Sequence, residues 1–340
     1  MLPKVVISNW VHQEVLDFLA PHCRVQANNS REPWSREALL GHAGDARAMM
    51  AFMPDAVDGD FLERCPDLGI IACALKGCDN FDVEACTRRG VWVTVVPDLL
   101  TNPTAELALG HLIALGRNMG PGDRAVRGGF AGWRPVLYGT GLEGSVVGIL
   151  GAGRVGCAIA RRLQGFDCAA ILYSDLHPLE PGVETELAMQ RVDIDGLLAR
   201  SDFVVVAVPL TPHTRHLIDG RALGLLKPGC RLVNISRGSV VDERAVAAAL
   251  DGGTLSGYGA DVFELEDWAL ADRPTGIPAA LLANREQTRF TPHLGSAVDR
   301  VRSEIGLQAA ASIVEYLRGE QPRGAVNEPD AASGGDSGIP

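Results

Sequence analysis

The chain has 340 residues, 46% hydrophobic and 21% charged, and a formal net charge of −11. This length accommodates two ordinary domains with separate cores, and the negative charge excludes nucleic acid and anionic membranes as main partners. The eight cysteines stand singly, without C-x-x-C pairs or metal-ligand spacing, so we expect free thiols in a reducing compartment and no metal.

Residues 1–100 alternate short apolar runs with helical patterns. The first run follows Lys4 directly with no secretory segment, and no stretch reaches membrane-spanning length, so we expect a cytoplasmic protein. Strands are predicted at 5–7, 48–52, 70–74 and 91–95, with helices near 11–19 and 60–65. This alternation predicts a parallel sheet flanked by helices. It lacks a glycine-rich phosphate loop, so we expect it to bind something other than a dinucleotide.

A helix is predicted to begin at Thr101, with Pro103 in its first turn, and to continue to Leu115. It leads to a polar, glycine-rich arm, residues 120–144, that contains Trp133 and Tyr138. A long irregular segment of this kind is typical of a lid, a domain crossing or an interface, and a mobile surface loop is the alternative.

The apolar run 146–150 breaks at glycines and resumes at helical spacing, a pattern of strand, tight turn and helix. Gly151 permits the turn, Gly153 lets backbone N–H groups approach a pyrophosphate, and Gly156 lets the helix pack close to the strand. The phosphates would then lie at the positive end of a helix. A glycine-rich turn without a ligand is the alternative for this motif alone.

A second apolar strand, 169–173, ends near Asp175, whose carboxylate would accept hydrogen bonds from both hydroxyls of an adenosine ribose. Its charge would repel a 2′-phosphate, so the pattern predicts NAD as cofactor in preference to NADP. Arg154, beside the phosphate loop, would contact a pyrophosphate oxygen and weaken that preference. A solvated cap is the alternative for Asp175.

Strands predicted at 203–208, 231–235, 257–262 and 289–291 complete a doubly wound domain, and one long helix over 296–318 would return to the first domain. We therefore predict an α/β chain of two Rossmann-like, doubly wound parallel-sheet domains, with the nucleotide domain inserted into the substrate domain. The substrate domain would comprise residues 1–100 and 296–327, and the NAD-binding domain 101–295. Residues 328–340, rich in Gly, Ser, Ala and Pro, are predicted to form a disordered tail.

Ligands of open α/β sheets bind beyond the carboxyl ends of strands, and the residues just after four predicted strands carry chemistry. These residues are Lys76, Arg237, Glu266 and His293. The set is typical of a cationic anion clamp with an oriented base. Taken alone, Lys76 is more typical of a surface lysine, and its place beside Arg237 and the flanking motifs reverses that interpretation.

Four motifs together resemble the signature of the D-2-hydroxyacid dehydrogenase family over nearly the whole chain. They are Gly151-x-Gly153-x-x-Gly156, Arg237-Gly238, Asp261-Val262-Phe263 with Glu266, and Pro292-His293-Leu294-Gly295. Within that family the chain is most similar to the phosphite (phosphonate) dehydrogenases. The matching stretches are 51–55, 74–77, 96–101, 138–142, 237–243, 264–268 and 271–274.

The resemblance implies NAD-dependent oxidation of phosphite to phosphate. Lys76, where hydroxyacid dehydrogenases have a small or apolar residue, would hold the phosphite dianion together with Arg237. His293 would act as general base on water, and Glu266 would orient its imidazole. Arg237 as the base stays open. Cys78 departs from the aromatic residue of the phosphite enzymes, which would loosen the packing behind Lys76.

Further residues are assigned by the same resemblance. Met53, Leu100 and Arg302 would complete the substrate site, although Met53 and Leu100 fit a core role equally well. The cofactor site would comprise Gly151, Gly153, Arg154, Val155, Gly156, Asp175, Thr104, Pro209, Ile235, Asp261 and Gly295. His213 and His216 are interpreted as surface residues.

Two other functions fit the same residues. The first is a 2-hydroxyacid dehydrogenase or a glyoxylate or hydroxypyruvate reductase, in which Lys76 would only strengthen carboxylate binding. The second is an NAD(H)-sensing binding protein without turnover. The arm and the resemblance together predict a homodimer that acts on a small anionic molecule.

Overall fold

The computed structural model describes residues 2–329. Of the predicted tail, 328–340, all but the first two residues lie outside this part. The described chain forms two compact units, the first comprising residues 2–100, Trp268–Ala271 and residues 297–329. The second comprises Thr101–Asp267 and Asp272–Ser296. The prediction of two parallel-sheet α/β domains is confirmed.

The first unit is built on a parallel sheet of order β2-β1-β3-β4-β5. Its strands are β1 (Lys4–Ile7), β2 (Arg24–Ala27), β3 (Ala48–Ala51), β4 (Ile70–Cys73) and β5 (Trp92–Thr94). Its helices are α1 (Gln13–Leu19), α2 (Arg36–Ala43), α3 (Gly59–Arg64), α4 (Val83–Arg88) and α13 (Asp299–Leu317). The sequence analysis missed β2 because this edge strand is only partly buried and lacks an apolar run.

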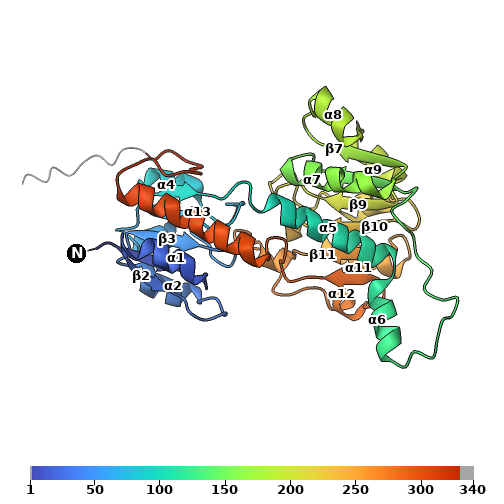
Figure 1. Ribbon diagram of the computed structural model, residues 1–340, viewed down its shortest axis with the longest axis horizontal. Helices are drawn as coiled ribbons and strands as arrows, with labels where there is room; N and C mark the ends of the chain where they lie inside the picture. The colour runs from blue at the N-terminus through green and yellow to red at the C-terminus, as the bar shows by residue number, and fades with distance from the viewer. Residues whose placement is uncertain (1, 330–340) are drawn as a thin grey trace, which may run out of the picture. The chain divides into compact units, whose positions relative to one another are not determined.

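Alternate residues of these strands serve two cores, as the pleat of a strand requires. Ile70 packs with α1 and α13 on one face of the sheet, and Ile71 packs with α2, α3 and α4 on the other. Figure 1 shows α13 lying along α1. The long final helix begins three residues later than predicted, because Val298 has an extended backbone (φ −103°, ψ 122°).

The second unit contains a parallel sheet of order β12-β11-β10-β9-β6-β7-β8. Its strands are β6 (Val146–Leu150), β7 (Ala170–Ser174), β8 (Met189–Arg191), β9 (Phe203–Val206), β10 (Arg231–Asn234), β11 (Gly257–Ala260) and β12 (Thr288–Phe290). The chain order reverses at β6, which lies between β7 and β9. The carboxyl end of β6 is therefore the position where open α/β sheets bind ligands.

Helices cover both faces of this sheet. One face carries α5 (Thr101–Gly116), α7 (Arg154–Leu163) and α8 (Pro181–Leu187), and Figure 1 shows α5 running beside α7. The other carries α9 (Ile194–Arg200), α10 (Gly220–Gly224), α11 (Glu243–Asp251) and α12 (Ala279–Ala283). Short 3-10 turns follow α7, β10 and β11, namely η1 (Gln164–Phe166), η2 (Gly238–Val240) and η3 (Glu264–Glu266).

The predicted irregular arm, 120–144, is partly wrong, since Met119–Arg127 forms a helix, α6. Glycines and a proline in its first turn hide the helical pattern in the sequence. Ion pairs from Arg127 to Asp123 (2.9 Å) and from Arg124 to Glu286 (2.6 Å) accompany the helix. The rest of the arm is irregular and projects from the body of the second unit (Figure 1).

Candidate active site

The turn after β6 fits the backbone approach that a pyrophosphate needs. Gly151 has φ +95°, and a Cβ there would lie 2.7 Å from the carbonyl oxygen of Ala207. A Cβ on Gly156 would lie 2.0 Å from the carbonyl oxygen of Gly151, so only glycine lets α7 approach the turn. A Cβ on Gly153, the N-cap of α7, would project into open space. This space at a helix N-terminus fits the phosphates of a dinucleotide.

Asp175 follows β7 and reaches this turn. Its carboxylate accepts hydrogen bonds from the backbone N–H of Ala152 (2.7 Å) and of His177 (3.3 Å). The guanidinium of Arg191 donates to the carbonyl oxygen of Asp175 (3.0 Å). Asp175, the residue predicted to bind the ribose, therefore lies beside the glycine turn. Arg154 is exposed there as the first residue of α7.

The other predicted cofactor residues lie at neighbouring positions of the second unit. Half-buried Val155 is on α7, exposed Pro209 follows β9, and Ile235 directly follows β10 with 7% of its surface exposed. Thr104 lies on α5, and its side-chain oxygen is 3.1 Å from where a Cβ of Gly295 would be. All belong to the elements that surround the carboxyl ends of β6, β9, β10 and β12.

Asp261 holds the loop that carries His293. Its buried carboxylate accepts hydrogen bonds from the backbone N–H of Leu294 (2.6 Å) and Gly295 (2.8 Å) and from the Thr291 hydroxyl (2.6 Å). The same hydroxyl lies 3.0 Å from Nε2 of His111, whose pKa burial lowers. The sequence analysis missed His111 and Thr291. Nothing in the sequence links a histidine inside a helix to a strand so distant along the chain.

His293 and Glu266 form the most chemically informative contact. Nδ1 of His293 lies 2.6 Å from one carboxylate oxygen of Glu266, and each side chain is 25% exposed. The other oxygen of Glu266 accepts the backbone N–H of Phe263 (2.8 Å). His293 itself has φ +55°, and its N–H donates to the carbonyl oxygen of Asp261 (2.8 Å). A carboxylate at Nδ1 directs Nε2 toward a substrate, as in other histidine bases.

Arg237 lies on the turn next to that of Glu266. It caps η2, and its carbonyl oxygen accepts a hydrogen bond from the buried Asn234 amide (2.9 Å). A Cβ on Gly238 would lie 1.9 Å from the carbonyl carbon of Phe263. The turns η2 and η3 thus pack backbone to backbone, which fixes the spacing of Arg237 and Glu266.

Three predicted substrate residues of the first unit, Lys76, Met53 and Arg302, lie near the carboxyl ends of β3 and β4. Lys76 is exposed shortly after the end of β4, and Met53 is half-buried. The guanidinium of Arg302, on α13, donates to the carbonyl oxygen of Ala74 (3.3 Å) and lies 5.7 Å from the centre of the Phe52 ring. Burial lowers the pKa of Arg302. Two cations therefore belong to this end of the sheet.

Leu100 packs against the core shared by α1 and α13, in agreement with the core role left open for it. The side chain of His216 is 35% exposed, but it also has a carboxylate partner that the sequence analysis did not find. Its Nε2 lies 2.9 Å from a carboxylate oxygen of Glu264, whose side chain is 10% exposed. His213, in the same loop, is exposed.

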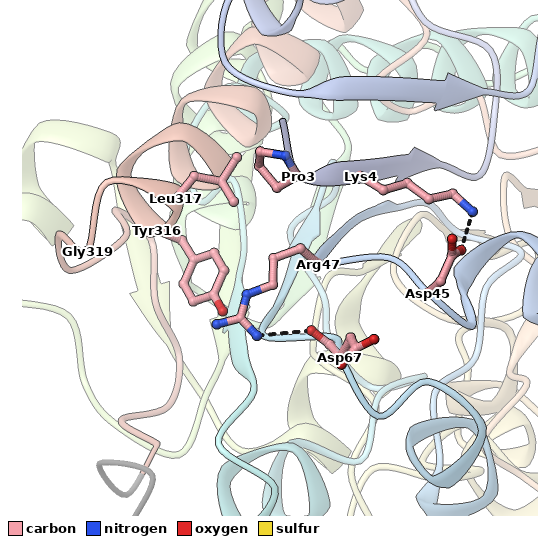
Figure 2. Close-up of a pocket in the computed structure, with 8 residues that line it drawn as sticks. All are labelled: Pro3, Lys4, Asp45, Arg47, Asp67, Tyr316, Leu317 and Gly319. Atoms are coloured by element: carbon pink, nitrogen blue, oxygen red, sulfur yellow. Dashed lines mark hydrogen bonds and ion pairs between the residues drawn. The ribbon is translucent and has the colours of Figure 1, made fainter. Parts of the chain in front are cut away.

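A pocket also lies on the first unit, away from these residues. Pro3, Lys4, Asp45, Arg47, Asp67, Tyr316, Leu317 and Gly319 line it, as Figure 2 shows. The guanidinium of Arg47 lies 5.5 Å from the centre of the Tyr316 ring and donates to the carbonyl oxygen of Asp67 (3.2 Å). Lys4 is the first residue of β1, and Arg47 directly precedes β3. The pocket therefore lies at the amino ends of these strands.

The described residues contain no candidate membrane-spanning helix and no candidate metal-binding group. No helix among them is long and apolar enough to cross a membrane. In the same part of the chain, no group of three or more His, Cys, Asp or Glu side chains is placed to hold a metal ion.

Comparison with known proteins gives concordant results. The family model described as "D-isomer specific 2-hydroxyacid dehydrogenase, NAD binding domain" matches residues 109–295. A protein named glyoxylate reductase from Thermococcus gammatolerans is 36% identical over 96% of this chain and 97% of its own length. A glyoxylate reductase from Pyrococcus furiosus is also 36% identical, over 96% of both chains. The crystal structure of the TT0316 protein from Thermus thermophilus superposes with a TM-score of 0.85 at 31% identity, covering 95% of this chain and 100% of that one.

Proposed function

We propose that this chain, which belongs to the D-isomer specific 2-hydroxyacid dehydrogenase family, oxidises phosphite to phosphate. The chain is an NAD-dependent oxidoreductase of that family, and its glycine turn and Asp175 fit the cofactor. The observation that carries the proposal is the exposed ammonium of Lys76 shortly after β4, on the unit that also carries Arg302. Phosphite is a compact dianion, so a site with more than one cation favours it over a monocarboxylate.

In the proposed reaction, Lys76 and Arg237 bind the phosphite oxygens and orient the P–H bond. Nε2 of His293 takes a proton from water while the water oxygen bonds to phosphorus. The P–H bond breaks, and its hydrogen leaves with both bonding electrons. NAD⁺ supplies the acceptor for that hydride. The carboxylate of Glu266 at Nδ1 stabilises the imidazolium that forms, and the two cations stabilise the charge on the oxygens.

Reduction of glyoxylate or a similar 2-oxoacid is the second candidate, and the names of the relatives favour it. In that reaction Arg237 would bind the carboxylate, and protonated His293 would donate a proton to the carbonyl oxygen as hydride arrives at carbon. Both reactions use the same histidine and carboxylate. They differ in the need for the Lys76 ammonium.

The test measures NADH formation with phosphite and NADH consumption with glyoxylate, using the unaltered enzyme, Lys76→Ala and the control Lys227→Ala. Lys227 is an exposed lysine that pairs with Asp202. We expect turnover of phosphite, a loss of about 100-fold in kcat/KM for phosphite in Lys76→Ala, and no change in Lys227→Ala.

Each other outcome has a defined meaning. If glyoxylate is reduced and phosphite is inert, the chain is a 2-oxoacid reductase and the role proposed for Lys76 is wrong. If neither substrate nor a panel of 2-hydroxyacids turns over while NAD binds, the NAD(H)-sensing function replaces both.

A further inference from the structure

Within its own turn, Glu266 has two hydrogen bonds, both to Phe263: its carboxylate accepts the backbone N–H of Phe263 (2.8 Å), and its own N–H donates to the Phe263 carbonyl oxygen (2.9 Å). Glu266 is the last residue of η3, a single turn of three residues. Turns of this length have few internal hydrogen bonds and hold their shape mainly through their surroundings. A displacement of η3 would move the Glu266 carboxylate away from Nδ1 of His293.

Glu264, the first residue of the same turn, is fixed by two partners. One oxygen of its carboxylate accepts the backbone N–H of Glu243 (3.1 Å), and the other lies 2.9 Å from Nε2 of His216. The backbone N–H of Glu264 donates to the Glu243 carboxylate (2.9 Å). Glu264 and Glu243 thus bind each other's backbone through their side chains, and Glu243 is 1% exposed.

The same contacts reach the turn that carries Arg237. The backbone N–H of His216 donates to the carbonyl oxygen of Ser239 (2.7 Å), and the N–H of Ser239 donates to the Asp267 carboxylate (2.7 Å). Asp267 directly follows η3 and is 2% exposed. The two turns of the catalytic set therefore share one network of hydrogen bonds.

Several carboxylates surround the contact between His216 and Glu264, and their charges increase the need for a hydrogen-bond donor there. Burial, together with the charges of Glu264, Glu266 and Asp267, raises the pKa of Glu243 to about 7. A donor is therefore needed where carboxylates gather, since like charges in a buried site repel one another. The imidazole N–H of His216 is such a donor. The guanidinium of the preceding residue, Arg215, is paired with a different carboxylate, that of Asp272 (2.7 Å).

We propose that His216 and Glu264, backed by Glu243, are positioning residues that hold the Glu266 carboxylate on Nδ1 of His293. The inference rests on the catalytic role proposed for that pair. None of the three is assigned to contact substrate or cofactor. Their loss would reduce the rate of the chemical step and leave NAD binding intact, because a misoriented base costs rate even when the ligands still bind.

The test uses His216→Asn, because asparagine tolerates the left-handed backbone of this position (φ +49°) but is too short to reach Glu264. His216→Gln keeps an N–H donor of similar reach, and His213→Asn is the matched control in the same loop. We expect His216→Asn to lower kcat about 10-fold with unchanged Kd for NAD, His216→Gln to recover most of that loss, and the control to be unaffected.

Two further measurements separate positioning from a general effect on stability. We expect His216→Asn to speed hydrogen exchange in a peptide covering residues 261–268 and to shift the acidic limb of the kcat/KM pH profile. A folded His216→Asn variant with unchanged kcat would overturn the proposal, and so would a loss that a His216→Gln variant of unaltered Tm does not recover. Glu266→Gln is measured in parallel, and if it leaves kcat unchanged, the catalytic pair itself is wrong and the proposed function fails independently.

Discussion

At the scale of single residues, the two histidines with carboxylate partners differ in how far the sequence reveals them. His293 follows the run that becomes β12, and strand ends are where ligands bind in such sheets, so the sequence predicts its involvement. His216 lies in a loop without periodicity, and its partner Glu264 is distant along the chain. Only the packing of η2 against η3 brings them together.

Replacing Glu266 tests the catalytic pair. In Glu266→Gln the amide still accepts a hydrogen bond but carries no charge to stabilise the imidazolium. We expect kcat to fall about 100-fold while the Kd for NAD is unchanged, measured by NADH absorbance and by cofactor titration. An unchanged kcat would show that the 2.6 Å contact with His293 is only structural.

Asp55 gives the first unit a pH-dependent stability. Burial raises its pKa to about 6, against the opposing hydrogen bonds from the Ser8 hydroxyl and the Phe52 N–H. Because the pKa of Asp55 is higher in the folded than in the unfolded chain, its protonated carboxyl stabilises the folded state. This contribution to the free energy of unfolding is complete below about pH 4, and about 3 kcal/mol of it is lost as the pH rises through 6.

Asp55→Asn keeps both hydrogen bonds and removes the titration. We expect the decline in Tm between about pH 4.5 and 7.5 to be smaller in Asp55→Asn than in the unaltered protein, measured by calorimetry. Equal declines in the two proteins would contradict this assignment.

At the scale of elements, the glycine turn between β6 and α7 shows how much a short motif encodes. The sequence predicts strand, turn and helix there, because apolar periodicity changes at glycines whose roles are steric. Helix α6 is the opposite case. Gly120, Pro121 and Gly122 occupy its first turn, so local propensity disfavours a helix there. Tertiary contacts, such as the ion pair of Arg124 with Glu286, stabilise the helix instead.

Two glycines of the turn are predicted to respond differently to alanine. In Gly156→Ala the Cβ meets backbone at 2.0 Å, so α7 must shift, and we expect a loss of about 3 kcal/mol in the free energy of unfolding. In Gly153→Ala the Cβ meets nothing within 4 Å, so we expect an unchanged Tm and NAD binding weaker by about 10-fold or more. Thermal unfolding and cofactor titration check both. Tight NAD binding by Gly153→Ala would refute the proposed phosphate site.

At the scale of the whole molecule, apolar periodicity predicts two α/β units and a chain that returns to the first one. It does not reveal that Trp268–Ala271 belongs to the first unit, because so short a segment carries no periodic pattern. The backbone N–H of Ala269 donates to the Asn80 side chain (3.3 Å), a contact that only tertiary structure shows. The substrate is not encoded in the fold either, since related sheets serve different anions.

The exposed side chains of the arm, residues 120–144, lead us to expect a homodimer. Several large apolar side chains on the arm are exposed, Trp133 by 81%, Tyr138 by 77% and Phe130 by 61%. Large exposed apolar side chains along one segment are typical of an interaction surface, and we expect a homodimer by analytical ultracentrifugation. The double variant Phe130→Ser with Trp133→Ser should sediment as a monomer. A monomeric unaltered protein would contradict the proposal.

The most direct measurement of the proposed function follows the hydrogen itself. The unaltered enzyme is incubated with NAD⁺ and phosphite deuterated at phosphorus, and the reduced cofactor is analysed by mass spectrometry. We predict that the reduced cofactor carries one deuterium, because the hydride comes from the P–H bond. Absence of reduced cofactor with phosphite, while glyoxylate is reduced by NADH, would contradict the account and establish the 2-oxoacid reaction in its place.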